Sequence, residues 1–175
     1  AGEIGIGSMG DPVPAPALVA IPNNEAVVSI AAGAYFHCAA VASGKVYCWG
    51  SGNSGELGVP GVTLAKAPLL PVSGISTAVA VTARQQHACA LLANKTVKCW
   101  GANDFGQLGS GDLVDSALPL PVSGLTNVAE VSAGSDHTCA RRSDGTVACW
   151  GSSYTGQVGT GVNGTFASPL QVTGL

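Results

Sequence analysis

Residues 48–58 read CWGSGNSGELG, a stretch that combines a cysteine, a tryptophan and four glycines. Two later stretches follow the same pattern: CWGANDFGQLG at 99–109 and CWGSSYTGQVG at 149–159. A pattern that returns every fifty residues or so belongs to the architecture, because a catalytic centre needs its residues only once. The sequence therefore predicts a repeat protein.

The repeat units become clear when the chain is aligned on these stretches. Three full units span 26–75, 76–125 and 126–175, and each contains an apolar strand, a histidine, a cysteine, a turn, V-x-C-W-G and G-x-x-G. The sequence GEIG near the start matches the later GELG, so residues 1–25 form a partial unit. We expect one repeat domain made of three units and part of a fourth.

The composition favours an all-β fold and excludes some partners. Of 175 residues, 25 are glycine, 10 are proline and only 10% are charged, which is typical of short strands joined by tight turns. The net charge of −3 provides no general attraction to nucleic acids or anionic membranes. The longest apolar stretch, AVVSIAAGAYF at 26–36, is too short to span a bilayer. We expect a soluble chain without a nucleic-acid partner or membrane insertion.

The six cysteines are spaced to form one disulfide in each unit. Two cysteines lie ten residues apart in every unit, and the midpoints Ser43, Asn94 and Asp144 fall in turn sequences. Antiparallel strands folded about such a midpoint place the cysteines opposite each other, within reach of a disulfide. Such bonds indicate an oxidising compartment. The predicted pairs are Cys38–Cys48, Cys89–Cys99 and Cys139–Cys149.

A metal site is the competing interpretation of the same cysteines. His37, His87 and His137 lie beside the first cysteine of each unit. Zinc sites mostly use closely spaced cysteine pairs, and two cysteines with one histidine leave the metal a ligand short. We therefore favour disulfides and expect no metal and no cofactor, with the histidines in structural roles.

The tryptophans are predicted to be packing anchors. Each one follows a cysteine on the same strand, so its side chain points to the opposite face of the sheet, where it can fill the space between neighbouring sheets. The glycines that follow allow positive-φ turns where the chain leaves the sheet. The predicted core residues are Trp49, Trp100 and Trp150.

The units resemble the repeats of the regulator of chromosome condensation (RCC) family. The likeness rests on AAG…H…A, then G-x-V-x-C-W-G-x-N-x-x-G-Q-L-G-x-G, and is clearest at 87–109 and 133–160. It implies a β-propeller built from four-stranded blades, typically seven. Members of the family include a nucleotide exchange factor for a small GTPase, a photoreceptor and secreted β-lactamase inhibitors, so the fold alone does not fix the function.

The chain departs from this family pattern in two respects. Three and a half units make about half of the usual ring, so we expect a propeller-like array that cannot close on itself by strand sharing. In the first unit, GAYFHC sets His37 directly beside Cys38, whereas GSDHTC leaves one residue between them. We therefore expect Phe36 to take the place that the histidine has in the other units.

The polar residues do not indicate an enzyme. Carboxylates such as Asp112 and Asp115 fall in loops and are expected to be solvated there, because no spacing among them demands paired acid–base chemistry. There is no phosphate-binding loop and no nucleophile motif. Two sequons, NKT at Asn94 and NGT at Asn163, are candidate glycosylation sites.

Three functions remain open. The first is a secreted or cell-surface structural protein whose subunits join head-to-tail through open blade edges into a filament or ring. The second is a secreted module that binds a protein or glycan partner through its loops. The third, which only the resemblance supports, is an exchange factor for an intracellular GTPase, and three disulfides weigh against it.

Overall fold

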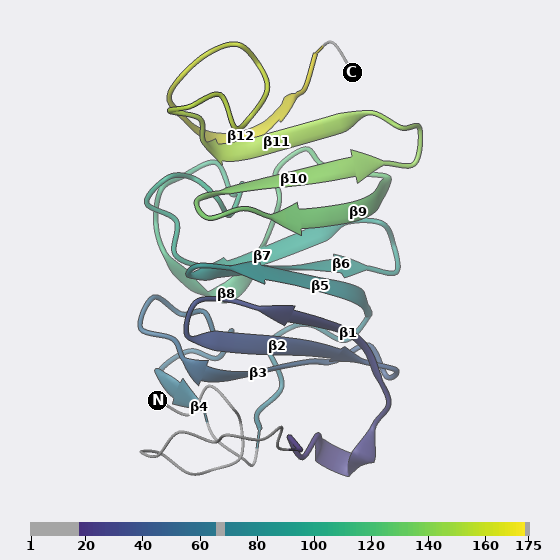
Figure 1. Cartoon of the computed structure of the whole chain (residues 1–175). Helices are drawn as coiled ribbons and strands as arrows, with labels where there is room; N and C mark the ends of the chain where they lie inside the picture. Colours follow the sequence, from purple (N-terminus) through teal and green to yellow (C-terminus); the bar gives the residue numbers. More distant parts are fainter. Residues whose placement is uncertain (1–17, 66–68, 174–175) are drawn as a thin grey trace.

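The computed structural model describes residues 18–65 and 69–173 and confirms the all-β architecture (Figure 1). Twelve strands form three antiparallel sheets of four, which succeed one another in chain order, with the first strand of each sheet nearest its neighbour. We name them sheet 1 (β1–β4), sheet 2 (β5–β8) and sheet 3 (β9–β12). Within the described residues, no helix is long and apolar enough to cross a membrane. The elements are a 3-10 turn η1 (Pro22–Asn24), β1 (Val27–Ala32), β2 (Phe36–Val41), β3 (Val46–Ser51), β4 (Leu64–Ala65), β5 (Ala78–Arg84), β6 (His87–Leu92), β7 (Val97–Gly101), β8 (Ser116–Pro121), β9 (Val128–Ala133), β10 (His137–Arg142), β11 (Val147–Ser152) and β12 (Thr165–Gln171).

The central hairpin of each sheet carries the predicted disulfide. In all three hairpins the two cysteines are register partners, with Cα atoms 4.0 to 4.1 Å apart. The spacing of ten residues therefore identified the turns correctly. The disulfides are Cys38–Cys48, Cys89–Cys99 and Cys139–Cys149.

Two of the three tryptophans fill the space between described sheets, as expected. Trp100 of sheet 2 is buried in a cluster that includes Phe36 and Leu57 of sheet 1 and its loops. Trp150 of sheet 3 occupies the equivalent place against sheet 2. Each indole nitrogen donates a 2.8 Å hydrogen bond to a backbone carbonyl of the preceding G-x-x-G turn, Trp100 to Glu56 and Trp150 to Gln107. Each tryptophan thus combines apolar burial with one bond that sets its position.

The first tryptophan lies against the N-terminal segment. Trp49 packs in a separate cluster with Tyr47 and Leu69, and the partly buried Val19 and Ile21 cover that cluster. Its indole nitrogen is buried and has no hydrogen-bond partner among the described residues. The GEIG sequence of the predicted partial unit lies outside the described residues.

Neighbouring sheets also exchange hydrogen bonds near their first strands. The Ser29 hydroxyl of sheet 1 accepts a 3.1 Å bond from the backbone N–H of Val81. The Thr82 hydroxyl of sheet 2 accepts a bond of the same length from the N–H of Ala133. A short hydroxyl side chain at each junction therefore satisfies a backbone donor of the next sheet.

Candidate functional site

The position three residues before the equivalent ring residues Phe36, His87 and His137 distinguishes sheet 2 from the other sheets. Sheets 1 and 3 have Gly33 and Gly134 there, and sheet 2 has Arg84. Residues that recur in every unit build the sheet, so a residue that breaks the repeat marks what is particular to this protein. Arg84 is therefore the first residue of the candidate site.

The glycine at this position makes room for a ring. A Cβ atom on Gly134 would overlap the imidazole of His137, and a Cβ on Gly33 would overlap the ring of Phe36. Arg84 carries that Cβ, so the His87 ring cannot lie where the His137 ring lies. His87 lies fully buried in the junction between sheets 2 and 3.

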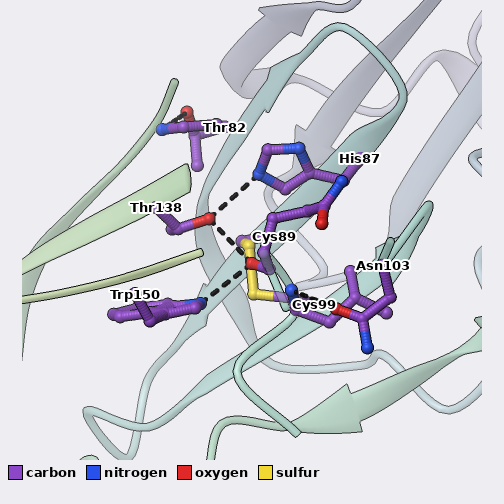
Figure 2. Close-up of a disulfide and its surroundings, with 10 residues drawn as sticks. Thr82, His87, Cys89, Cys99, Asn103, Thr138 and Trp150 are labelled. Atoms are coloured by element: carbon purple, nitrogen blue, oxygen red, sulfur yellow. Dashed lines mark hydrogen bonds between the residues drawn. A yellow bond between two sulfur atoms is a disulfide. The ribbon is translucent and has the colours of Figure 1, made fainter. Parts of the chain in front are cut away.

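In that junction His87 is part of a buried hydrogen-bond chain (Figure 2). Its Nε2 lies 2.9 Å from the Thr138 hydroxyl of sheet 3, and that hydroxyl donates to the backbone carbonyl of Gln107 at 2.9 Å. The same carbonyl accepts the indole N–H of Trp150. Because the threonine proton is used toward Gln107, the His87 Nε2 must be the donor in its bond to Thr138.

This arrangement fixes the charge state of His87. With the proton on Nε2, the buried Nδ1 finds no partner among the described residues, so a second proton there would have no acceptor. Burial is the main cause that lowers the pKa of His87 to about 4, and the nearby His137 lowers it further. His87 is therefore neutral at physiological pH.

His137 occupies the same position in sheet 3 but has a different environment. It is only partly buried, because no further sheet covers it within the described residues. Burial lowers its pKa, Asp136 opposes that change, and Arg84 adds to it. Arg84 of sheet 2 is therefore close enough to His137 of sheet 3 for their charges to interact.

We call the uncovered side of sheet 3 the outer face, defined by Glu130, Ser132, His137, Arg141 and Val147. The equivalent residues of sheet 2, such as Leu91 and Val97, are buried against sheet 3. Where sheet 2 has Leu91, which is 7% exposed, sheet 3 has Arg141, whose side chain is 48% exposed.

The outer face is polar, although the equivalent face of sheet 2 is apolar and buried. Arg141 forms an ion pair with Glu130 at 3.2 Å, and the Ser132 hydroxyl is exposed beside them. Exposed ion pairs of this kind contribute at most about 1 kcal/mol to stability. The pair therefore matters more for what this face can contact than for folding.

The loop aspartates have a larger role than the sequence indicated. Asp112 and Asp115 are exposed, as expected, but they also hold the buried Asn103. Asp115 accepts the backbone N–H of Asn103 at 2.8 Å, and Asp112 accepts its side-chain amide at 3.1 Å. Asn103 in turn accepts the N–H of Leu108 at 2.9 Å. These aspartates organise the turn that presents the Gln107 carbonyl.

The remaining candidate residues lie apart from this region. Asn94 is exposed at a hairpin turn, where its side-chain oxygen accepts bonds from the backbone and hydroxyl of Thr96. Asn163 is exposed just before β12. Phe36 fills the sheet 1 position equivalent to His87, as expected, and His37 lies beside Trp49 with ring centroids 5.8 Å apart. Across the described ranges, no three His, Cys, Asp or Glu residues gather as metal ligands do.

Sequence reasoning missed Arg84, Thr138 and Gln107. The substitution of Gly by Arg84 was a visible signal, since it breaks the repeat. Thr138 had no signal of its own, because its partner His87 is 51 residues away and belongs to another unit.

The comparison with protein families identifies one type of repeat, which matches several segments of the chain. A family model described as the regulator of chromosome condensation (RCC1) repeat matches residues 43–91 and 97–141. A second model with the same description matches 27–56, 77–107 and 128–157. Each model covers more than half of the chain.

The chain matches only part of the length of each curated relative. The secretion-regulating guanine nucleotide exchange factor of Bos taurus is 44% identical over 96 residues, which is 50% of this chain and 20% of that protein. The ultraviolet-B receptor UVR8 of Arabidopsis thaliana is 32% identical over 121 residues, 67% of this chain and 27% of the receptor. The chain thus spans about a quarter or less of these relatives.

Solved structures share the fold. Human WBSCR16 superposes with a TM-score of 0.77 over 88% of this chain and 42% of its own, at 22% identity. Yeast RCC1 (Prp20), solved bound to Kap60, gives a TM-score of 0.75 over 85% of this chain and 37% of its own, also at 22% identity. At this identity the likeness concerns the arrangement of the sheets.

Proposed function

Because this chain belongs to the regulator of chromosome condensation (RCC1) repeat family, we propose that it is a non-enzymatic module that binds another protein through the outer face of sheet 3. The observation that carries the proposal is the change of chemistry between equivalent positions. Leu91 is buried in the apolar junction, whereas Arg141 is exposed and paired with Glu130. Polar, partly solvated faces suit partners that bind and leave.

Site-specific photo-crosslinking tests this function. A photoreactive residue placed at Val147 lies on the outer face, and one placed at Ser54 lies in a loop of sheet 1. We expect a protein partner to crosslink at position 147 and not at 54. The purified partner should then bind the intact chain, and Arg141→Glu should weaken this binding about tenfold or more. Equal crosslinking of the partner at both positions, or an unchanged affinity for the Arg141→Glu variant, would contradict the proposal.

A second candidate is self-association head-to-tail into a filament or ring. The supporting observation is that the two ends offer parts of a junction. Sheet 3 presents Ser132 and the Gln157 turn, equivalents of the Thr82 and Gln107 groups that sheet 2 uses to hold sheet 3. At the other end, Val28 and Ile30 of β1 are 54% and 70% exposed.

The oligomeric state tests this second candidate. Light scattering over a range of concentrations should show growth beyond the monomer, and Ile30→Glu should suppress it because a charge would enter the new junction. A chain that stays monomeric at all concentrations eliminates self-association and leaves the first proposal in place.

We propose that the protein acts outside the cytosol. Three disulfides in a chain of this size fit an oxidising compartment. The exposed sequon residues Asn94 and Asn163 are accessible for N-glycosylation there. Expression in a secretory eukaryotic cell should give a mass that falls on enzymatic deglycosylation, and Asn94→Gln with Asn163→Gln should abolish the change. If the chain is secreted without modification, the glycosylation prediction is wrong and the proposed location outside the cytosol stands.

A further inference from the structure

A polar cavity of about 330 Å³ lies at the end of the β9–β10 hairpin, where sheet 2 meets the outer face of sheet 3. It is lined by Arg84 from sheet 2 and by Ser132, Ser135 and His137 from sheet 3, with backbone around Gly134. Because Gly134 has no side chain, the His137 ring packs directly over its backbone, and both residues line the cavity.

The four polar side chains of the lining can each donate a hydrogen bond. Arg84 is exposed, and its guanidinium forms no hydrogen bond or ion pair within the described part of the chain. Its positive charge is permanent. Ser132 and Ser135 add two hydroxyl donors, and neither hydroxyl is used by another described residue. Asp136 acts on His137 from the neighbouring position but does not line the cavity.

We propose that this cavity binds a carboxylate side chain, Asp or Glu, of an acidic segment in a partner protein. This inference rests on the proposed function, because it names the chemistry that the outer face recognises. One permanent cation and two hydroxyl donors that line the same cavity match one carboxylate, and arginine is suited to bind both of its oxygens.

Phosphate fits the cavity less well. A phosphate group carries nearly two negative charges at neutral pH and calls for a second cation. The candidate for that role is His137, but burial and the adjacent Arg84 lower its pKa, so the ring is mostly neutral at pH 7. The positive charge available to a ligand is therefore that of Arg84 alone.

The comparison of units also supports a recognition role. Sheets 1 and 3 form the same hairpin with Gly33 and Gly134 in place of Arg84. The sheet does not need an arginine there, and an exposed cation at this position adds little to stability. Arg84 instead supplies a charge to the neighbouring sheet, which is what a binding residue does.

A small probe tests the cavity independently of any partner. N-acetyl-glutamate amide carries one carboxylate, and N-acetyl-glutamine amide is its neutral match in shape. We expect the first compound to shift the NMR signals of the His137 ring saturably, with a Kd on the order of millimolar for so small a ligand. The glutamine compound should bind at least about tenfold more weakly.

Two arginine variants complete the test. Arg84→Gln should weaken binding of the glutamate probe about tenfold or more. Arg142→Gln should leave the binding unchanged, because Arg142 does not line the cavity and instead donates a 2.9 Å hydrogen bond to the side chain of Gln171. Equal responses to the two probes, or an unchanged response in Arg84→Gln, would refute the inference. Tighter Arg84-dependent binding of inorganic phosphate would also refute it.

The same variants separate this inference from the proposed function. If the glutamate probe fails to bind but crosslinking at Val147 still captures a specific partner, the carboxylate site is wrong and the binding module stands. If the probe binds as expected and no partner is captured at Val147, the site stands and the choice of binding face is wrong.

Discussion

The two faces of sheet 3 follow the same repeat pattern but differ in burial. On the side that faces sheet 2, Thr138, Ala140 and Trp150 are almost fully buried, and both the Thr138 hydroxyl and the Trp150 indole N–H are hydrogen-bonded. On the outer face, Arg141 and Glu130 are exposed. The repeat fixes where a side chain points, and the presence or absence of a neighbouring sheet decides which chemistry is tolerated at that position.

Trp150→Ala removes the largest side chain from the covered side. We expect a loss of about 3–5 kcal/mol in the free energy of unfolding, because the indole is fully buried and its bond to Gln107 would be lost. Tyr154→Ala is the control, since that ring is 60% exposed and should cost under about 1 kcal/mol. Chemical denaturation measures both. Similar losses for the two variants would mean that the covered side does not carry the stability.

His87 should make the covered junction sensitive to acid. Its pKa is about 4 when folded and 6.5 in an ordinary environment. Between these values the unfolded chain binds a proton that the folded chain does not, so stability falls as the pH is lowered from 6.5 toward 4. The loss attributable to His87 is at most about 3 kcal/mol.

His87→Gln isolates that contribution, because an amide can still donate to Thr138 and does not titrate. Denaturation measured from pH 7 to pH 4 should show a flatter profile in this variant than in the natural chain. His137→Gln is the matched control and should change the profile less, since His137 is only partly buried. Parallel profiles for the natural chain and His87→Gln would show that the buried histidine is not the acid-sensitive group.

The valines at one repeat position compare the two sides directly. Val97 is 2% exposed in the junction, and Val147 lies on the outer face. Val97→Ala should cost about 1.5–2.5 kcal/mol and Val147→Ala under about 1 kcal/mol, because only the first leaves a cavity. Thermal or urea unfolding checks the difference. If Val147→Ala proved as costly as Val97→Ala, another sheet or chain must cover the outer face in solution.

The smallest effect concerns the turns that accept the tryptophan bonds. Glu56 occupies in sheet 1 the place of Gln107 and Gln157, and burial raises its pKa. A raised carboxyl pKa means that the charged form is disfavoured in the fold, so Glu56→Gln should stabilise the protein by about 0.5 kcal/mol at pH 7. The gain should vanish below the ordinary carboxyl pKa of 4.5. A loss of stability at pH 7 would show that the Glu56 charge is used.

The features that could be predicted from the sequence are those set by the spacing of residues within one unit. Cysteines ten residues apart, centred on a turn, can pair only one way in a hairpin, and a tryptophan next to a cysteine must face the other side. The histidine chain was not predictable in this way. Whether His87 meets Thr138 depends on how two sheets pack against each other, which a single-unit pattern does not encode. The role of Asp112 was missed because its partner Asn103 belongs to a turn whose shape is set by packing.

The bond from each tryptophan to the preceding turn has a consequence for biosynthesis. Trp100 and Trp150 follow their carbonyl acceptors by 44 and 43 residues. At translation rates of about 5–20 residues per second, each acceptor turn precedes its tryptophan by roughly 2–9 s, which is long compared with hairpin formation. Every new sheet therefore emerges onto a template that has had time to form. The chain can be assembled vectorially from its N-terminal side, with each indole registering one sheet on the one before it.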